Sequence, residues 1–188
     1  METPSVSRER LILAGIQELE INGLSGFSLR KVAQRCGVSC AAPYKHFKDK
    51  RALVLAIAEH YNAQWVARQR AALEHTEADV TRQLQEVCKE YLRFLLDNPN
   101  YCTLATLNDA ATGKWFIQRL FDGRTNTKQL IYQYCDYHGM DSETAHAKIV
   151  LLRGLLFGVA MLVGSGELEL SEHRIELLYR EINSAFLS

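Results

Sequence analysis

Apolar residues recur every three or four positions along most of this 188-residue chain, and few runs alternate like a β-strand. Residues repeated at this spacing share one face of a helix. The sequence therefore predicts an all-α protein of about nine helices. Apolar residues make up 47% of the chain, and 3 Pro and 11 Gly are too few for a disordered or turn-rich chain. A hydrophobic core is expected without help from disulfides or metal ions.

Positive charge is concentrated near the N-terminus. The whole chain carries 22 basic and 22 acidic residues, so its formal net charge is zero. Between Asn22 and Ala52, however, seven Lys or Arg residues accompany a single acidic residue, Asp49. Such a block on an otherwise acidic chain is typical of a surface that binds a polyanion, although a solvated helix face would show the same composition.

Motifs for metal binding and catalysis are missing from the sequence. The five cysteines form no C-x-x-C pair, and no His/Cys group has the spacing of a zinc site. The sequence also lacks the H-E-x-x-H, G-x-S-x-G and Gly-rich phosphate-loop patterns. We therefore expect no enzyme activity, no cofactor and no metal.

The sequence predicts a cytoplasmic protein with reduced thiols and no membrane partner. The N-terminus lacks the apolar region of a signal peptide. The longest apolar stretch, Ile149 to Val163, is interrupted by Arg153 and is shorter than the roughly 20 residues of a membrane span.

Two short helices joined by a tight turn are predicted between residues 28 and 45. Ser28 is a suitable N-cap for a helix with one apolar face that runs to Cys36, and Gly37 is suited to end it. Ser39 is placed to cap a second, very short helix that ends at about Lys45. This pattern is typical of a helix-turn-helix that binds DNA.

In such a pair the first helix crosses the phosphate backbone and the second lies in the major groove. The first would carry Arg30 and Lys31 to the backbone. The second would offer Cys40, Ala41 and Lys45 to the bases.

This stretch resembles the DNA-binding domain of the TetR family of bacterial transcriptional regulators. The resemblance is carried by FSLRKVA from Phe27, CGVS from Cys36 and AAPYKHFKDK from Ala41, and it covers about residues 8–60. It implies that Tyr44 and Lys50 contact phosphate with help from Ser28 and His46, and that residues 39–45 contact bases. The complete set of expected DNA contacts is Ser28, Arg30, Lys31, Ser39, Cys40, Ala41, Ala42, Tyr44, Lys45, His46 and Lys50.

Two residues depart from the family pattern. Ala42 stands where a hydroxyl residue that touches phosphate is common, and Pro43 stands where a branched apolar residue is commoner. Pro43 removes a backbone donor early in the helix and is expected to bias Ala42 away from helical angles. A subset of the family has a similar Ala-Ala-Pro-Tyr string, so we expect DNA binding to be retained.

The sequence divides into a helix-turn-helix domain over residues 1–52 and a second domain over 53–188, linked by a long helix that starts at residue 50. The resemblance implies that the second domain dimerises and holds an inducer. The predicted helix from Ser142 to about Val163 is apolar on most sides, which suits an interface or, alternatively, a central core position. The expected interface residues are Leu151, Gly154, Leu155, Gly158, Leu162, Ile175, Leu178, Tyr179 and Ile182.

Aromatic and soft apolar side chains of the middle helices would line the inducer pocket, although each could equally belong to the core. The candidates are Trp65, Tyr91, Phe94, Tyr101, Leu104, Leu107, Trp115, Phe116, Tyr132 and Met161. Together they favour a moderately hydrophobic small molecule.

The sequence thus predicts a homodimeric transcriptional regulator, most simply a repressor, that binds a palindromic operator and is released by a small molecule. The alternatives are an architectural DNA-binding protein and a thiol sensor. In the thiol sensor, Cys40 would be reactive because helix starts and nearby Lys45 favour a thiolate.

Overall fold

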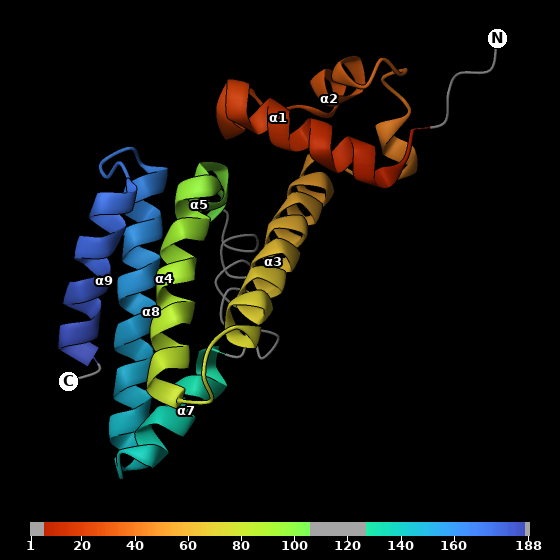
Figure 1. Ribbon diagram of the computed structural model, residues 1–188. Coiled ribbons are helices and arrows are strands. Elements are labelled where there is room, and N and C mark those ends of the chain that lie inside the picture. The colour runs from red at the N-terminus through yellow and green to blue at the C-terminus, as the bar shows by residue number, and fades with distance from the viewer. Residues whose placement is uncertain (1–5, 106–126, 187–188) are drawn as a thin grey trace. The chain divides into compact units, whose positions relative to one another are not determined.

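The computed structural model describes residues 6–105 and 127–186. The described residues contain helices and no strand, which confirms the all-α prediction. The α-helices, labelled in Figure 1, are α1 (Arg8–Gly26), α2 (Leu29–Arg35), α3 (Lys50–Glu74), α4 (Val80–Asp97), α5 (Pro99–Ala105), α7 (Thr127–Tyr137), α8 (Ser142–Gly164) and α9 (Glu172–Phe186). A 3-10 helix, η1 (Pro43–Lys45), lies between α2 and α3 in the chain.

The chain forms two compact units that divide within α3, one of residues Met1–Tyr61 and the other of Asn62–Ser188. The sequence placed the division at residue 52. The first turns of α3 belong to the N-terminal unit because their side chains, such as Leu53 and Ile57, are fully buried there.

Three helices build the N-terminal unit around a small apolar core. The Ser7 hydroxyl caps α1 by accepting a hydrogen bond from the Arg10 amide, and α1 kinks at Gly23, whose φ of 59° suits only glycine. Gly15 of α1 lies directly against Ile57 of α3, where an added Cβ would come within 2.8 Å of Ile57 Cδ1. Gly15 therefore allows α1 and α3 to pack closely.

The second helix of the predicted pair is shorter and tighter than the sequence suggested. Between Ser39 and Pro43 the chain makes turns, and only Pro43–Lys45 is helical, with 3-10 geometry. Pro43 has no N–H to donate to Ser39, and the Ser39 carbonyl instead accepts from Ala42 at 2.9 Å. The expected bias at Ala42 was wrong, because its φ and ψ of −60° and −43° are helical.

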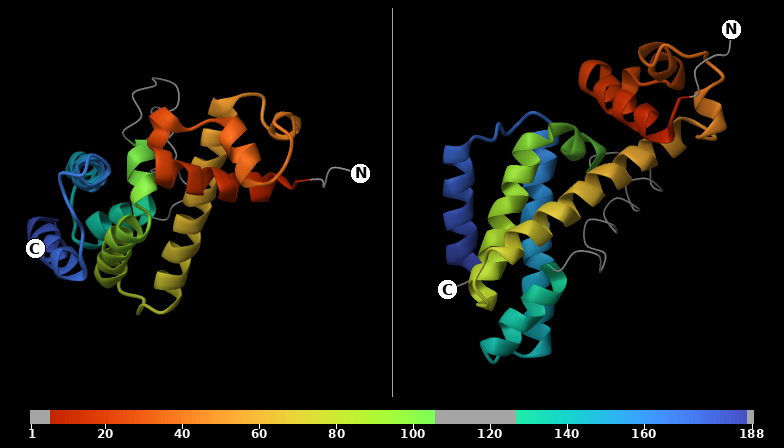
Figure 2. Two further views of the ribbon diagram at one scale, coloured as in Figure 1. Left: turned by 90° about the horizontal axis from the view of Figure 1, so that it is seen from above. Right: turned by 45° about the vertical axis from the view of Figure 1, so that its right-hand side comes forward.

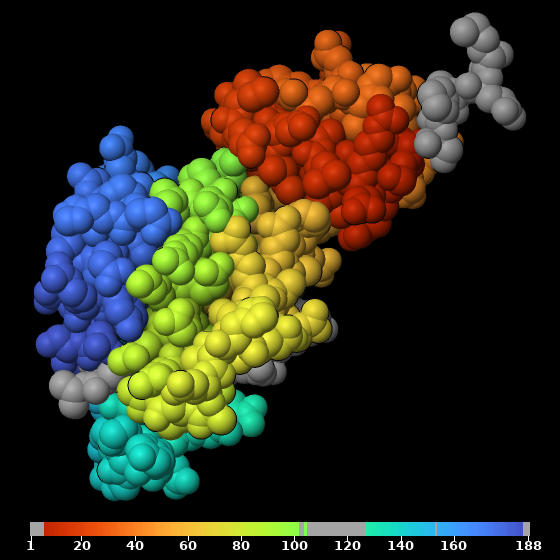
Figure 3. Space-filling view, viewed as in Figure 1, coloured from red at the N-terminus to blue at the C-terminus, as the bar shows by residue number. Residues whose placement is uncertain are grey.

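The C-terminal unit is a helical bundle in which α4, α8 and α9 run alongside one another (Figures 1 and 2). α4 packs against α7 and α9, and α8 packs against α5 and α7. Figure 3 shows α9 lying along α4 on the surface. The fully buried side chains of α4, which are spaced at helical intervals, are Leu84, Val87, Cys88, Tyr91, Leu92, Phe94 and Leu95.

Helix boundaries in this unit agree closely with the capping residues in the sequence. Asp79 and Asp141 cap α4 and α8 by accepting hydrogen bonds from backbone amides at 2.7 Å. α5 begins at Pro99, in keeping with the tolerance of proline for the first turn of a helix. Among the described helices, α8 alone is long and apolar enough to cross a membrane, a property that it shares with the core helices of soluble proteins.

Candidate nucleic-acid interface

Of the seven residues 39–45, here called the 39–45 segment, five are exposed on the N-terminal unit. Tyr44 is 60% exposed, and Ser39, Cys40, Ala41 and Lys45 are also exposed. Pro43 points inward and is buried. Phe47, also buried, donates its amide to the Pro43 carbonyl at 2.9 Å. The segment therefore offers small side chains, a phenol and an ammonium group on a fixed backbone.

The helix that precedes this segment in the chain, α2, has the N-cap that the sequence predicted. The Ser28 hydroxyl accepts a hydrogen bond from the Lys31 amide at 3.3 Å. Arg30 is exposed and makes no ion pair with another described residue. Arg30 is thus available to an external anion.

Lys31 is exposed, but its ammonium group has partners within the N-terminal unit. Its ammonium group donates to the Gly26 carbonyl at 3.1 Å and lies 3.7 Å from the carboxylate of Glu18. Glu18 is also bound by Arg35 at 2.9 Å. No local motif in the sequence marks these contacts, because the packing of neighbouring helices creates them.

Two further expected phosphate contacts also have partners within the N-terminal unit. Lys50 donates to the Leu24 carbonyl at 2.9 Å and lies 5.8 Å from the centre of the Phe27 ring. The Nε2 atom of His46 lies 2.9 Å from the Val6 carbonyl oxygen. Both side chains are exposed and join separate parts of the unit.

The described cysteines differ in exposure. Cys40 is exposed on the 39–45 segment, whereas Cys36, Cys88 and Cys135 are buried. Burial raises the pKa of the Cys36 thiol, although Arg10 and Arg35 oppose that shift. Any thiol chemistry in the described part of the N-terminal unit would therefore involve Cys40.

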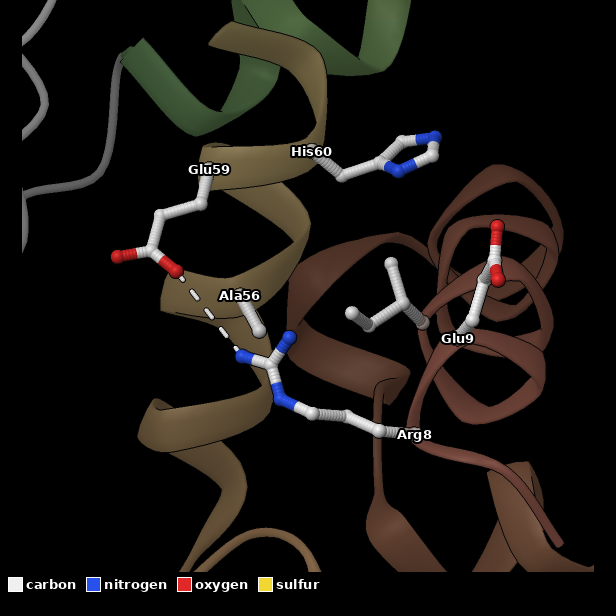
Figure 4. Close-up of a pocket in the computed structure, with 6 residues that line it drawn as sticks. Arg8, Glu9, Ala56, Glu59 and His60 are labelled. Atoms are coloured by element: carbon white, nitrogen blue, oxygen red, sulfur yellow. Dashed lines mark ion pairs between the residues drawn. The ribbon is translucent and has the colours of Figure 1, made fainter. Parts of the chain in front are cut away.

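A hollow of about 400 Å³ opens between α1 and α3 within the N-terminal unit (Figure 4). Arg8 and Glu59 face each other there, with 4.0 Å between their charged groups, and Glu9 and His60 also line it. None of the predicted DNA contacts lines the hollow. It is a feature separate from the 39–45 segment.

Four of the predicted pocket residues form one aromatic cluster in the C-terminal unit. The ring centres of Trp65 and Tyr91 are 5.0 Å apart, and those of Phe94 and Tyr101 are 4.9 Å apart. All four rings and Leu104 are buried. The Arg68 guanidinium, which the sequence analysis missed, lies 5.7 Å from the centre of the Phe94 ring.

The other predicted pocket residues are not part of this cluster. Tyr132 and Met161 are each 42% exposed, so they lie on the surface of the protomer. Leu107, Trp115 and Phe116 lie outside the described residues. The apolar spacing in the sequence could not distinguish buried from exposed aromatic residues on amphipathic helices.

The predicted interface residues divide between a free surface and the protomer core. Leu151, Leu155 and Leu162 are 60%, 43% and 43% exposed on α8. An added Cβ at Gly154 or Gly158 would meet no atom within 4 Å. These five residues form an open apolar stripe on α8, here called the α8 stripe.

The predicted residues of α9 mostly face inward. Ile175 and Ile182 are buried within the protomer, so they are not on its free surface. Leu178 and Tyr179 are half-buried, and the Lys89 ammonium lies 5.1 Å from the centre of the Tyr179 ring. Leu177 of α9, absent from the predicted set, is 39% exposed.

Comparison with known proteins finds sequence similarity in the N-terminal unit. Residues 11–57 match the model of the family described as bacterial regulatory proteins, tetR family. The class C tetracycline repressor protein of Escherichia coli is 43% identical over 54 residues, which are 29% of this chain and 25% of that repressor. The matched segment spans no more than a quarter of the curated relatives it resembles.

Similarity of fold extends over nearly the whole chain. The structure of the regulator FadR from Bacillus subtilis in complex with stearoyl-CoA has a TM-score of 0.76 at 12% identity, covering 94% of this chain and 97% of that one. A TetR/AcrR-family regulator from Thermobifida fusca YX-ER1 has a TM-score of 0.68 at 19% identity, covering 92% and 94%. At these identities the comparison establishes a shared fold.

Proposed function

We propose that this chain, whose residues 11–57 match the tetR family of bacterial regulatory proteins, represses transcription by binding a palindromic operator as a homodimer. The observation that supports this proposal most directly is that five side chains of the 39–45 segment are exposed while Pro43 and Phe47 anchor the segment in the core of the unit. Helix-turn-helix proteins present such a segment to base edges in the major groove.

The distribution of charge supports this assignment. Arg30 and Lys45 are exposed on either side of the turn, and Arg30 makes no ion pair with another described residue. Tyr44 exposes a hydroxyl, which can donate a hydrogen bond to a phosphate oxygen. In this proposal Arg30, Tyr44 and Ser39 position the unit on the backbone, while Cys40, Ala41 and Lys45 contact base edges.

The α8 stripe supports the homodimer. An apolar helix face in water is unfavourable, and a second copy of α8 can approach closely where Gly154 and Gly158 leave open space. A two-fold dimer presents two 39–45 segments, which matches a palindrome with half-sites one or more helical turns apart.

A small molecule bound by the C-terminal unit would supply the regulation. In this proposal an apolar ligand with a polar group would have to open the buried aromatic cluster beside Arg68, whose guanidinium is paired with Glu90 at 3.3 Å and with Asp97 at 2.6 Å. Since the FadR structure of the same fold holds stearoyl-CoA, an acyl-CoA is one ligand to test. Such a ligand would release the operator if it bound the DNA-free conformation more tightly.

A matched pair of substitutions tests the DNA-binding assignment. Ala41→Asp places a carboxylate on the 39–45 segment, and Ala71→Asp makes the same change at an exposed position of α3 in the C-terminal unit. Fluorescence anisotropy with duplex DNA should show at least ~10-fold weaker binding for Ala41→Asp alone, because the carboxylate meets phosphate charge. Equal effects of the two changes, with unchanged thermal unfolding, would contradict the assignment.

A further inference from the structure

Glu18 is a buried carboxylate in the middle of α1. Its side chain is 2% exposed, and the described residues contain one other buried polar side chain, Gln69. The neighbours of Glu18 on the buried face of α1, Ala14, Gly15 and Leu19, carry no polar side-chain atoms. A charge at such a place is unfavourable unless it is paired and hydrogen-bonded.

Three side chains meet the two carboxylate oxygens. Oε1 accepts a hydrogen bond from Asn22 at 2.7 Å and lies 3.7 Å from the Lys31 ammonium. Oε2 accepts from the Arg35 guanidinium at 2.9 Å. Asn22 lies at the kink before α2, and Lys31 and Arg35 are one helical turn apart on α2. Glu18 thus joins α1 to both turns of α2.

These contacts bear on the net charge that α2 offers to DNA. Lys31 and Arg35 are 45% and 30% exposed, so both remain near solvent while their charged groups face Glu18. Arg30 is exposed and makes no ion pair with another described residue. Phosphate contacts from α2 raise affinity for every sequence equally, because backbone charge carries no sequence information.

The geometry points to Glu18 as a specificity-determining positioning residue: it holds Lys31 and Arg35 as an internal counter-ion and so limits sequence-independent binding to DNA phosphates. This role rests on the proposed function. Glu18 itself touches no DNA. It pairs with the charged groups of Lys31 and Arg35, which would otherwise neutralise DNA phosphates. The choice of duplex then depends on the base contacts of the 39–45 segment.

The test uses Glu18→Gln in the full-length chain. The amide keeps the size of the side chain and removes its charge. Binding to a non-specific duplex, measured over a series of salt concentrations, should become tighter, and the slope of log K against log salt should steepen by ~0.9 for each cation released. The ratio of operator to non-specific affinity should fall.

Matched variants locate the effect. Glu20→Gln removes an exposed charge from the same helix and should change neither the slope nor the ratio. Adding Lys31→Gln to Glu18→Gln should return part of the slope toward that of the parent protein. If Glu18→Gln does not fold, Glu18→Leu removes the same charge with an apolar side chain of similar size that suits the apolar face of α1. Lys31 and Arg35, which are 45% and 30% exposed, can then be solvated by water.

The outcomes separate this inference from the proposed function. If the unmodified protein does not bind duplex DNA, the proposed function is wrong. If it binds and the folded Glu18 variants lose affinity for operator and non-specific DNA equally with an unchanged slope, Glu18 is only structural and the inference is overturned. An equal effect of Glu20→Gln would also overturn it.

Discussion

Single side chains divide into those that face an external partner and those that hold the fold together. Tyr44 and Lys45 are exposed on the 39–45 segment, whereas Lys50 is tied to the Leu24 carbonyl. The motif in the sequence identified all three positions but could not show which of these side chains has a hydrogen-bond partner within the protein. That information depends on residues 20 or more positions away in the chain.

Removing one hydroxyl tests the backbone contact assigned to Tyr44. Tyr44→Phe should weaken binding to all duplexes by a similar factor, with little loss of stability, because the ring is 60% exposed. Tyr137→Phe, which removes a hydroxyl from a residue that is 72% exposed in the C-terminal unit, is the control. Anisotropy titrations measure both, and a change in sequence preference for Tyr44→Phe would contradict a phosphate contact.

The opposite behaviour is expected of Lys45. Lys45→Ala should change the preferred bases in a selection from random duplexes, because this side chain is assigned to base edges. A uniform loss of affinity with an unchanged preferred sequence would place Lys45 on the backbone instead.

The buried thiol of Cys88 is expected to lower the free energy of unfolding as the pH rises above 9. Burial raises the pKa of its thiol from 9.0 to about 12 in the folded protein. Above pH 9 the unfolded chain loses a proton that the folded chain keeps, so the free energy of unfolding falls by up to about 1.4 kcal/mol per pH unit. The contribution is complete below pH 9. Urea unfolding of Cys88→Ala should show a shallower decline between pH 9 and 11; parallel declines would contradict the assignment.

At the scale of helices, capping residues made most boundaries predictable. Ser28 was expected as an N-cap and accepts a backbone hydrogen bond there, whereas Ser39, also expected as a cap, supplies no side-chain cap to η1. Side-chain caps at the starts of the other helices are supplied by Ser7, Asp49 and Asp79. The helix expected at 39–45 is reduced to the 3-10 helix η1 at Pro43–Lys45, because Pro43 has no N–H to donate to the Ser39 carbonyl. Side-chain partners such as Glu18 with Arg35 could not be predicted, since helix packing brings them together.

The cap of α2 gives a direct test at this scale. Ser28→Ala should lower the free energy of unfolding by about 1 kcal/mol, because it removes the acceptor for the Lys31 amide. Ser39→Ala is the control, since Ser39 supplies no side-chain cap to η1. Equal thermal shifts for the two variants would contradict the capping role.

At the scale of the whole molecule, the account requires a dimer built on α8. Leu151 is 60% exposed at one end of the α8 stripe, and Leu151→Glu should weaken the proposed dimer by at least ~100-fold, since an interface would bury an unpaired carboxylate. Ile21→Glu places the same charge at a 67% exposed position of α1. Sedimentation equilibrium distinguishes them, and a dimer that survives Leu151→Glu would refute the interface.

The central claim is that this chain recognises a specific DNA sequence through two 39–45 segments. Selection of bound fragments from genomic DNA by the purified full-length protein, at a stated salt concentration, tests it most directly. The account predicts one palindromic motif with half-sites separated by whole helical turns, ~34–36 Å each. Diffuse, salt-sensitive binding without a motif would contradict it and favour an architectural DNA-binding protein.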